Sequence, residues 1–238
     1  NFTKEVADEE IISYAKKLGY PLVIKPTDGT GGTGVIANIK NEEDFKQALS
    51  YVRYDLGFPN VIVEQYFSGE DLRIYVVGDQ AIGAFTRTRA NVIGDGKNTI
   101  RTLLKMKMKE RDKNPALFKR PIKIDQEMHT VLKEQGYTLE SIPEKDERVF
   151  LKAKGNVSSG GDSVDVTDDL SDEIKAVAIN AVKAIPGLEN AGIDLIADID
   201  KNTAVVLEIN SQASIRNHLF PMVGKARDIP KAIIDHYF

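Results

Sequence analysis

Two carboxylates in the last quarter of the chain have a spacing that suits a metal ion. Residues 191–200 and 203–209 are rich in apolar and β-branched side chains and read as the strands of one hairpin. A three-residue loop places Asp194 opposite Glu208, with Asn210 on the same face as Glu208. Facing carboxylates repel, and Glu208 is expected to be buried because it lies in an apolar run. Mg²⁺ would resolve this conflict, and screening by water at a sheet edge is the alternative.

The other face of this hairpin supports the same register. With that loop, the cross-strand pairs are apolar throughout: Ile193 with Ile209, Leu195 with Leu207, and Ala197 with Val205. A continuous apolar face predicts that this side of the hairpin packs on the core.

A glycine-rich segment near the N-terminal end has the composition of a phosphate-binding loop. Residues 29–34 fit G-x-G-x-x-G, but residues 35–39 are strand-like, whereas a dinucleotide-binding fingerprint needs a helix there. A Walker loop is also excluded, because no Lys-Ser or Lys-Thr closes the run. The segment therefore predicts a strand–loop–strand hairpin whose backbone N–H groups cover phosphates. Lys25, just before the loop, is placed to pair with phosphate, and an exposed edge lysine is the alternative.

These groups must be positioned by a mixture of helices and hairpins. We expect helices in residues 1–18, in a segment that Asn41 caps, in parts of 99–136, and in 171–185 and 229–237. Further strands are expected at 21–25, 61–66, 72–77, 81–88 and 148–152, with a turn at Gly78-Asp79. Because hairpins dominate, the order predicts an α+β fold with antiparallel sheets rather than a doubly wound parallel sheet.

Composition excludes several classes of protein. The 238 residues are 42% hydrophobic, enough for a sizeable core, and no apolar run approaches the roughly 18 residues of a membrane span. The net charge of −4 argues against a nucleic-acid partner. With no cysteine, disulfides and thiol catalysis are excluded, which fits a cytoplasmic protein. The one basic stretch, residues 105–120, is interpreted mostly as a solvated helix face and loop. The alternative is a positively charged rim of the site that attracts anionic substrates.

Several motifs, in this order along the chain, resemble the ATP-grasp superfamily. They are Leu-Val-Ile-Lys25-Pro, the glycine-rich loop, Val-Ile-Val-Glu64-Gln-Tyr-Phe67, Gly-Glu-Asp71-Leu-Arg73, and Ile-Asp194 paired with Leu-Glu208-Ile-Asn210. The segments around Asn91, Gly136, Asn156 and Arg216 are most similar to the ATP-grasp modules of cyanophycin synthetases and bifunctional glutathione synthetases. The resemblance implies two lobes with antiparallel sheets and flanking helices that grip ATP, a small lobe at residues 1–70 and a large lobe at 71–238.

The resemblance also implies roles for individual residues. Nucleotide binding would fall to Lys25, Thr30, Gly31, Gly32, Thr33, Glu64, Gln65, Phe67 and Asp71, and one or two Mg²⁺ would be bound by Asp194, Glu208 and Asn210. Arg216, Arg73, Arg87 and Arg89 are the candidates for steadying substrate carboxylates and the reaction's oxyanion, and surface arginines are the alternative. His218 is expected to be structural, because such a reaction needs no histidine base.

The implied activity is that of an ATP-dependent carboxylate–amine ligase acting on an amino acid or short peptide through an acylphosphate. A kinase-like phosphotransferase and a non-catalytic nucleotide-binding module are the alternatives. The resembled enzymes have a substrate-binding domain and a phosphate-binding lysine before this core. The chain is therefore expected to be part of a longer protein, with small-molecule carboxylate and amine substrates and no membrane partner, and a homo-oligomer stays open.

Overall fold

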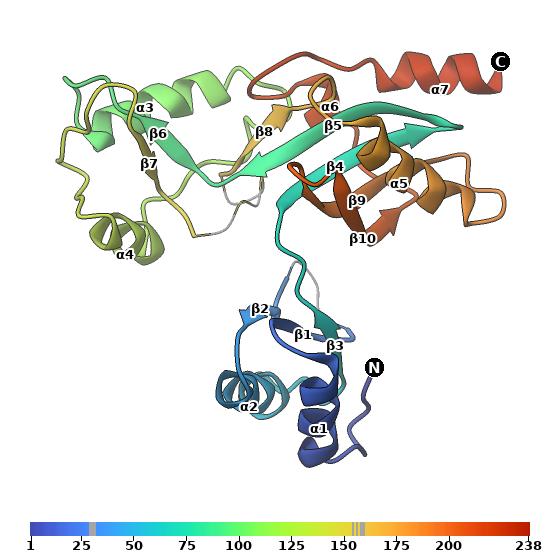
Figure 1. Ribbon diagram of the computed structural model, residues 1–238. Coiled ribbons are helices and arrows are strands. Elements are labelled where there is room, and N and C mark those ends of the chain that lie inside the picture. Colours follow the sequence, from blue (N-terminus) through green and yellow to red (C-terminus); the bar gives the residue numbers. More distant parts are fainter. Residues whose placement is uncertain (29–31, 154, 156, 158–159) are drawn as a thin grey trace. The chain divides into compact units, whose positions relative to one another are not determined.

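The structure is a computed structural model that describes residues 1–28, 32–153, 155, 157 and 160–238. The chain divides into two units, Asn1–Ser68 and Gly69–Phe238, each built on its own hydrophobic core (Figure 1). The paired strands of every sheet in the described part are antiparallel, with helices packed on the sheets. This architecture confirms the predicted α+β class.

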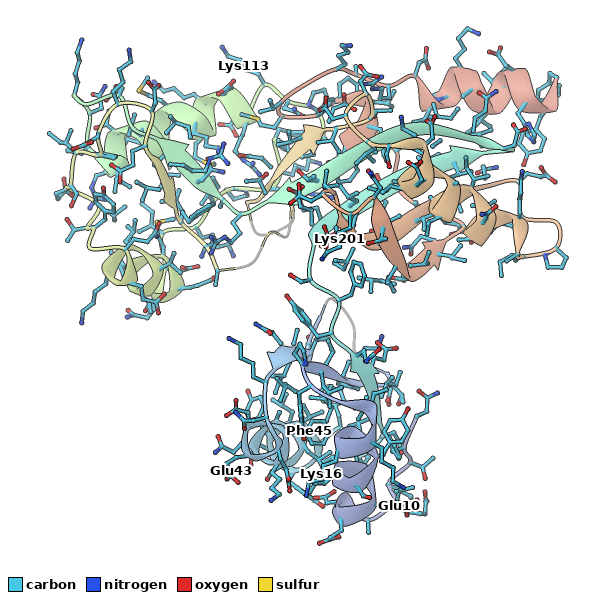
Figure 2. The ribbon with its side chains drawn as sticks, viewed as in Figure 1. Glu10, Lys16, Glu43, Phe45, Lys113 and Lys201 are labelled. Carbon is cyan, nitrogen blue, oxygen red and sulfur yellow. The ribbon has the colours of Figure 1, made fainter. Side chains whose placement is uncertain are left out.

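The first unit packs helices against a three-stranded sheet of order β2-β1-β3. Its elements are α1 (Asp8–Leu18), β1 (Leu22–Pro26), β2 (Ile36–Ile39), α2 (Glu42–Ser50), which continues as one wider turn (Tyr51–Asp55), and β3 (Val61–Gln65). Asn41 caps α2 as expected, accepting a hydrogen bond of 2.9 Å from the Asp44 N–H. Phe45 is fully buried within this unit, and Glu10, Lys16 and Glu43 lie on its surface (Figure 2).

The first helix is shorter than the sequence pattern predicts. It begins at Asp8, and the expectation that it starts at Asn1 was wrong. Phe2 instead exchanges two backbone hydrogen bonds with Val61, of 2.8 and 2.9 Å. This pairing to a distant strand satisfies the backbone groups that an additional helical turn would have used.

The second unit is organised around a five-stranded sheet of order β10-β9-β4-β5-β8. Its elements are β4 (Glu70–Val77), β5 (Gln80–Thr88), β6 (Asn91–Ile93), α3 (Ile100–Arg111), α4 (Gln126–Glu134), β7 (Arg148–Phe150), β8 (Asp162–Asp165), α5 (Asp172–Lys183), β9 (Asn190–Asp198), β10 (Thr203–Asn210), α6 (Arg216–Leu219) and α7 (Ile229–Tyr237). The short strands β6 and β8 were not expected. With β7, β6 forms a separate ribbon that packs with α3 and α4 into a satellite core.

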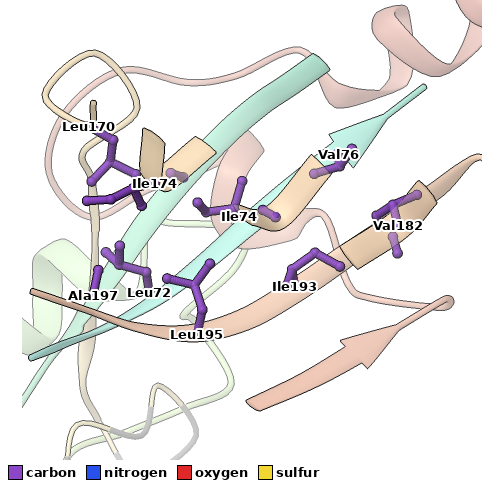
Figure 3. Packing of buried hydrophobic residues seen from close by; sticks show 12 residues of the cluster. Leu72, Ile74, Val76, Leu170, Ile174, Val182, Ile193, Leu195 and Ala197 are labelled. Carbon is purple, nitrogen blue, oxygen red and sulfur yellow. The ribbon is translucent and has the colours of Figure 1, made fainter. Parts of the chain in front are cut away.

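Side chains alternate between the two faces along β4 and β9, which gives the sheet one apolar face and one face that carries candidate site residues. Leu72, Ile74 and Val76 of β4 and the odd-numbered residues of β9 pack against α5 in the main core (Figure 3). The residues between them, including Arg73 and Asp194, therefore lie on the opposite face. That face is covered in part by α6 and α7, which contact β4 and β5. Within the described residues, no helix has the length and apolar character needed to cross a membrane.

Candidate active site

The predicted carboxylate pair is present, and a β-bulge positions it. Asp194 and Glu208 are Cα partners across β9 and β10, as expected, and the register shifts between Val206 and Glu208. Before the shift, Ala204 and Val206 pack on the main core, and after it Ile209 does so. The extra residue, Leu207, thus turns Glu208 onto the face that carries Asp194.

Two expectations for this hairpin were wrong. Leu195 pairs with Val206 rather than Leu207, and Ala197 pairs with Ala204. The reason is that the loop is one residue longer than assumed, and the bulge restores the expected register only near the site. Glu208 is exposed rather than buried, because β10 is an edge strand whose apolar residues do not all face the core.

Asp194 is held by two arginines. Its carboxylate accepts hydrogen bonds from Arg73 Nε at 2.6 Å and Arg73 Nη2 at 2.5 Å, and from Arg87 Nη2 at 2.5 Å. Arg87 also donates to Asp71 Oδ1 at 2.7 Å, and Asn210 Nδ2 donates to Asp194 Oδ2 at 3.1 Å. Arg73 is the Cα partner of Asp194 on the neighbouring strand, so sheet register alone brings this pair together.

These contacts keep the Asp194 carboxyl ionised although only 8% of the residue is exposed. Burial raises its pKa, but the hydrogen bond from Arg73 and the charges of Arg87 and Arg73 outweigh burial, and the pKa lies below its usual value. Asp194 is therefore a buried anion at neutral pH, which is what a metal ligand or an arginine anchor requires.

The donor set fits Mg²⁺. Asp194 and Glu208 supply carboxylate oxygens and Asn210 an amide oxygen, which are the hard ligands that this ion prefers. Glu208 is exposed and open to further ligands. The described part of the chain holds no group of three or more histidine, cysteine, aspartate or glutamate side chains that could bind a metal. Such a site would thus rely on Asn210, water or substrate oxygens in addition to the carboxylate pair.

Beside Asp194 lies a cavity of about 300 Å³ that we call the arginine pocket. Its lining includes the guanidinium-bearing residues Arg73, Arg87, Arg120 and Arg216, together with Phe85 and Val157. The structure thus brings together three of the four arginines that the sequence singled out, whereas Arg89 does not line this pocket and stacks on the Phe150 ring instead. It adds Arg120, which sequence reasoning had placed on a solvated surface. Only the alternative interpretation of residues 105–120, a positively charged rim that attracts anionic substrates, had pointed to it.

Lys25 lies in the first unit and is paired with another predicted nucleotide-binding residue. Its Nζ is 2.7 Å from Glu64 Oε2, across neighbouring strands β1 and β3. Gly34 closes the glycine-rich loop with a φ of +73°, and a Cβ there would lie 2.8 Å from Pro26 Cγ, so only glycine fits. Thr30 and Gly31 lie outside the described residues.

The remaining predicted site residues are divided between the units. Gly32, Thr33, Gln65 and Phe67 belong to the first unit, and Gln65 donates to the Leu18 carbonyl at 3.4 Å. Asp71 is the second residue of β4 in the second unit, which also holds every candidate metal ligand.

His218 lies under this site without a polar partner. Its ring packs edge-on against Phe85 and Tyr75, and neither ring nitrogen has a hydrogen-bond partner in the described structure. Burial, reinforced by the charge of Arg73 and opposed by Asp165, lowers the pKa of His218 to about 3. The imidazole is therefore neutral, which is the structural role expected of it.

This buried histidine predicts an acid-sensitive fold. Because the pKa of His218 is about 3 when folded and 6.5 normally, the unfolded chain binds the proton first, and stability is lost as pH falls below 6.5. The loss is about 2 kcal/mol at pH 5, at 1.36 kcal/mol per pH unit. Urea unfolding at pH 7 and pH 5 measures this loss in the free energy of unfolding, which should be smaller in His218→Leu than in the wild type. His129→Gln on the exposed surface of α4 is the control, and an unchanged difference in His218→Leu would contradict the account.

Comparison with known proteins decides the family. A family model described as an ATP-grasp domain matches residues 5–214. The chain belongs to the ATP-grasp family. This confirms the resemblance and the ATP-grasp fold that it implied. The match spans both units, so the ATP-grasp domain includes the glycine-rich loop as well as Asp194 and Glu208.

Known ATP-grasp proteins of two kinds are similar to this chain. A cyanophycin synthetase of Synechocystis sp. is 34% identical over 227 residues, covering 92% of this chain and 26% of the relative. The glutathione biosynthesis bifunctional protein GshAB of Pasteurella multocida is 34% identical over 244 residues, covering 97% and 32%. The crystal structure of a bifunctional glutathione synthetase from the same organism has a TM-score of 0.74 and 31% identity, covering 95% and 32%. The chain therefore spans about a quarter to a third of these relatives.

Proposed function

We propose that this chain is the ATP-using catalytic module of a ligase that joins a carboxylate to an amine. The observation that carries the proposal is the contact between Asp194 and two arginines of the arginine pocket. A carboxylate that can bind a metal ion, beside a cationic cavity of this size, suits a reaction that transfers a phosphoryl group to a substrate carboxylate. Membership of the ATP-grasp family and the synthetase names of the relatives support the same class.

The proposed reaction has two steps. A carboxylate oxygen of the first substrate attacks the γ-phosphorus of ATP, the bond to the β-phosphate oxygen breaks, and ADP and an acylphosphate form. An amine then attacks the acyl carbon, phosphate leaves with the bonding electrons, and the amine loses a proton, which gives an amide. Such chemistry depends on positioning and on neutralising charge.

Each residue has a role in that scheme. Lys25 binds phosphate oxygens, the glycine-rich loop with Gly32 and Thr33 covers them, and Asp71 accepts hydrogen bonds from the ribose. Glu64, Gln65 and Phe67 contact the adenine. Asp194, Glu208 and Asn210 bind one or two Mg²⁺, which when bound supplies positive charge to the phosphates. Arg216, Arg73 and Arg87 orient the substrate carboxylate and stabilise the oxyanion.

The substrates follow from the relatives. We propose an amino acid or a short peptide as the carboxylate, with an amine partner of the same class. The share of the relatives that the chain covers supports placing it within a longer protein that contributes to substrate binding.

The test is calorimetric titration of the chain with a non-hydrolysable ATP analogue, with and without Mg²⁺. Lys25→Ala removes a charge-assisted contact to phosphate, so we expect binding about 10- to 100-fold weaker than wild type. Lys40→Ala, an exposed lysine of the same unit, is the matched control. Equal affinities for the Lys25 and Lys40 variants would remove the assigned role of Lys25. Absence of binding by folded wild-type and full-length protein would refute the nucleotide site.

A trapping experiment separates the ligase from the alternatives. Hydroxylamine converts an acylphosphate into a hydroxamate, which is detected by its ferric complex. A ligase should give hydroxamate and ADP together when a carboxylate substrate is present. ADP without hydroxamate, from a broad panel of carboxylates, would favour a phosphotransferase that forms another phosphoester.

A further inference from the structure

Arg120 places a cation in the arginine pocket that the reaction scheme has not used. Arg73 and Arg87 are both paired with Asp194, and Arg87 also with Asp71. Within the described residues, neither Arg120 nor Arg216 has an ion pair, and the residues outside that part, which are Gly, Thr, Lys, Asn and Ser, carry no carboxylate. The pocket thus has two more guanidinium groups than its two aspartates balance, which favours an anionic occupant.

The backbone of Arg120 is fixed by a buried arginine. Arg111, at the end of α3, has a fully buried side chain whose Nη2 donates to the Arg120 carbonyl at 3.2 Å. Its Nη1 donates to the Gly161 carbonyl at 3.1 Å and to Asp162 Oδ1 at 2.6 Å. One guanidinium therefore ties the segment that carries Arg120 to the start of β8.

The residues just before β8 lie close to the Arg120 segment. Val157, which lines the pocket, lies four residues before Gly161. Gly160 approaches the Arg120 segment so closely that a Cβ there would lie 2.7 Å from Ile122 Cγ1. The cluster of Lys107, Arg111 and Asp162 thus ties the Arg120 segment to Gly161 and Asp162, with Lys107 Nζ 2.5 Å from Asp162 Oδ2.

A buried ion cluster is a costly way to hold two loops. Apolar side chains of similar volume often give equal or greater stability, so the cluster indicates a demand for defined geometry rather than for stability alone. The rigid guanidinium fork of Arg111 can serve two carbonyls and a carboxylate at once, which a lysine amine on a flexible stem cannot do with the same geometry.

We propose that Arg120 binds an anionic group of the substrate in the arginine pocket, and that Arg111, anchored by Asp162, is the positioning residue for it. This inference rests on the proposed function for the identity of the substrate. The recognition chemistry is that of a carboxylate or phosphate oxyanion, for which the planar guanidinium forms paired hydrogen bonds.

The test follows arginine Nε–H signals in the NMR spectrum while inorganic phosphate is added as the probe, with and without MgADP. Phosphate should shift the Arg120 signal, and Arg120→Gln should weaken phosphate binding about tenfold or more. Lys119→Gln, the exposed neighbouring cation, should bind phosphate as wild type does. Unchanged phosphate affinity in Arg120→Gln, or no binding by the wild-type chain, would overturn the proposal.

Arg111→Lys separates positioning from folding. It keeps a cation beside Asp162 but loses the bridge to the two carbonyls, so we expect weaker phosphate binding in a chain that still melts cooperatively. If Arg111→Lys binds phosphate as wild type does, Arg111 is structural only. The titration without MgADP tests this proposal independently of the nucleotide site. If MgADP fails to bind, that result counts against the proposed function, and the phosphate measurement still tests the roles of Arg120 and Arg111.

Discussion

Asp194→Asn is expected to lower Mg²⁺-dependent ADP formation by the full-length protein about 100- to 1,000-fold, the usual effect of losing one electrostatic group at a reacting phosphoryl or acyl centre. The change removes the negative charge that we assign to the metal and that also anchors Arg73 and Arg87. It keeps the size of the side chain but leaves Arg73 and Arg87 without their shared counter-charge, so the fold of the variant is checked by circular dichroism before turnover is compared. The metal is followed separately through the electron paramagnetic resonance of Mn²⁺ in the presence of a non-hydrolysable ATP analogue. Turnover and Mn²⁺ binding should both fall in this variant.

The matched control for this prediction is Asp198→Asn. Asp198 ends the same strand but pairs with Lys201 in the hairpin loop, away from the arginines. This variant should keep wild-type turnover and Mn²⁺ binding. If Asp194→Asn turned over ATP at the wild-type rate while remaining folded, Asp194 would serve only to anchor arginines, and the metal assignment would fail.

Asp162→Asn is expected to lower the free energy of unfolding by about 3–5 kcal/mol, the cost of removing one partner from a buried ion pair. Asp162 is the carboxylate partner of both Lys107 and Arg111, and its side chain is 6% exposed. Without it, the fully buried Arg111 and Lys107, whose side chain is 14% exposed, share one site with no counter-charge. A loss of this size is a large fraction of the stability of an ordinary domain. Urea unfolding followed by circular dichroism measures the difference.

An exposed ion pair of α3, the helix that also carries Lys107 and Arg111, provides the comparison. Arg101 pairs with Glu140 at 2.7 Å, but their side chains are 41% and 66% exposed, so Glu140→Gln should cost at most about 1 kcal/mol. Equal effects of Asp162→Asn and Glu140→Gln would show that the buried cluster is not a structural anchor. It would also remove the physical basis for the positioning role of Arg111.

The interpretation of the basic stretch at residues 105–120 shows where sequence reasoning stopped. Most of its cations do lie toward solvent, as the pattern indicated. Lys107 and Arg111 do not, because their partner, Asp162, follows some fifty residues later on a strand that the pattern had not predicted. A side chain is buried or exposed by what packs on it, and neither periodicity nor local charge carries that information.

What the sequence by itself determined was local in origin. Alternating apolar residues and a short polar turn were enough to predict the hairpin of β9 and β10, but its pairing of Asp194 with Glu208 is correct only because the bulge offsets a loop one residue longer than assumed. Glycines before a β-branched run were enough to distinguish this loop from a dinucleotide-binding turn. The order of these motifs was enough to identify the family, which the comparisons confirmed.

The tertiary structure decided how those elements meet. A bulge at Leu207 turns Glu208 to the side of Asp194, and only the packing of β10 at the sheet edge reveals it. Register between β4 and β9 sets Arg73 against Asp194, and the buried contacts of Arg111 bring Arg120 to the same pocket. These contacts join residues far apart in the chain, and their energies depend on burial and strand pairing that form only when the whole second unit folds.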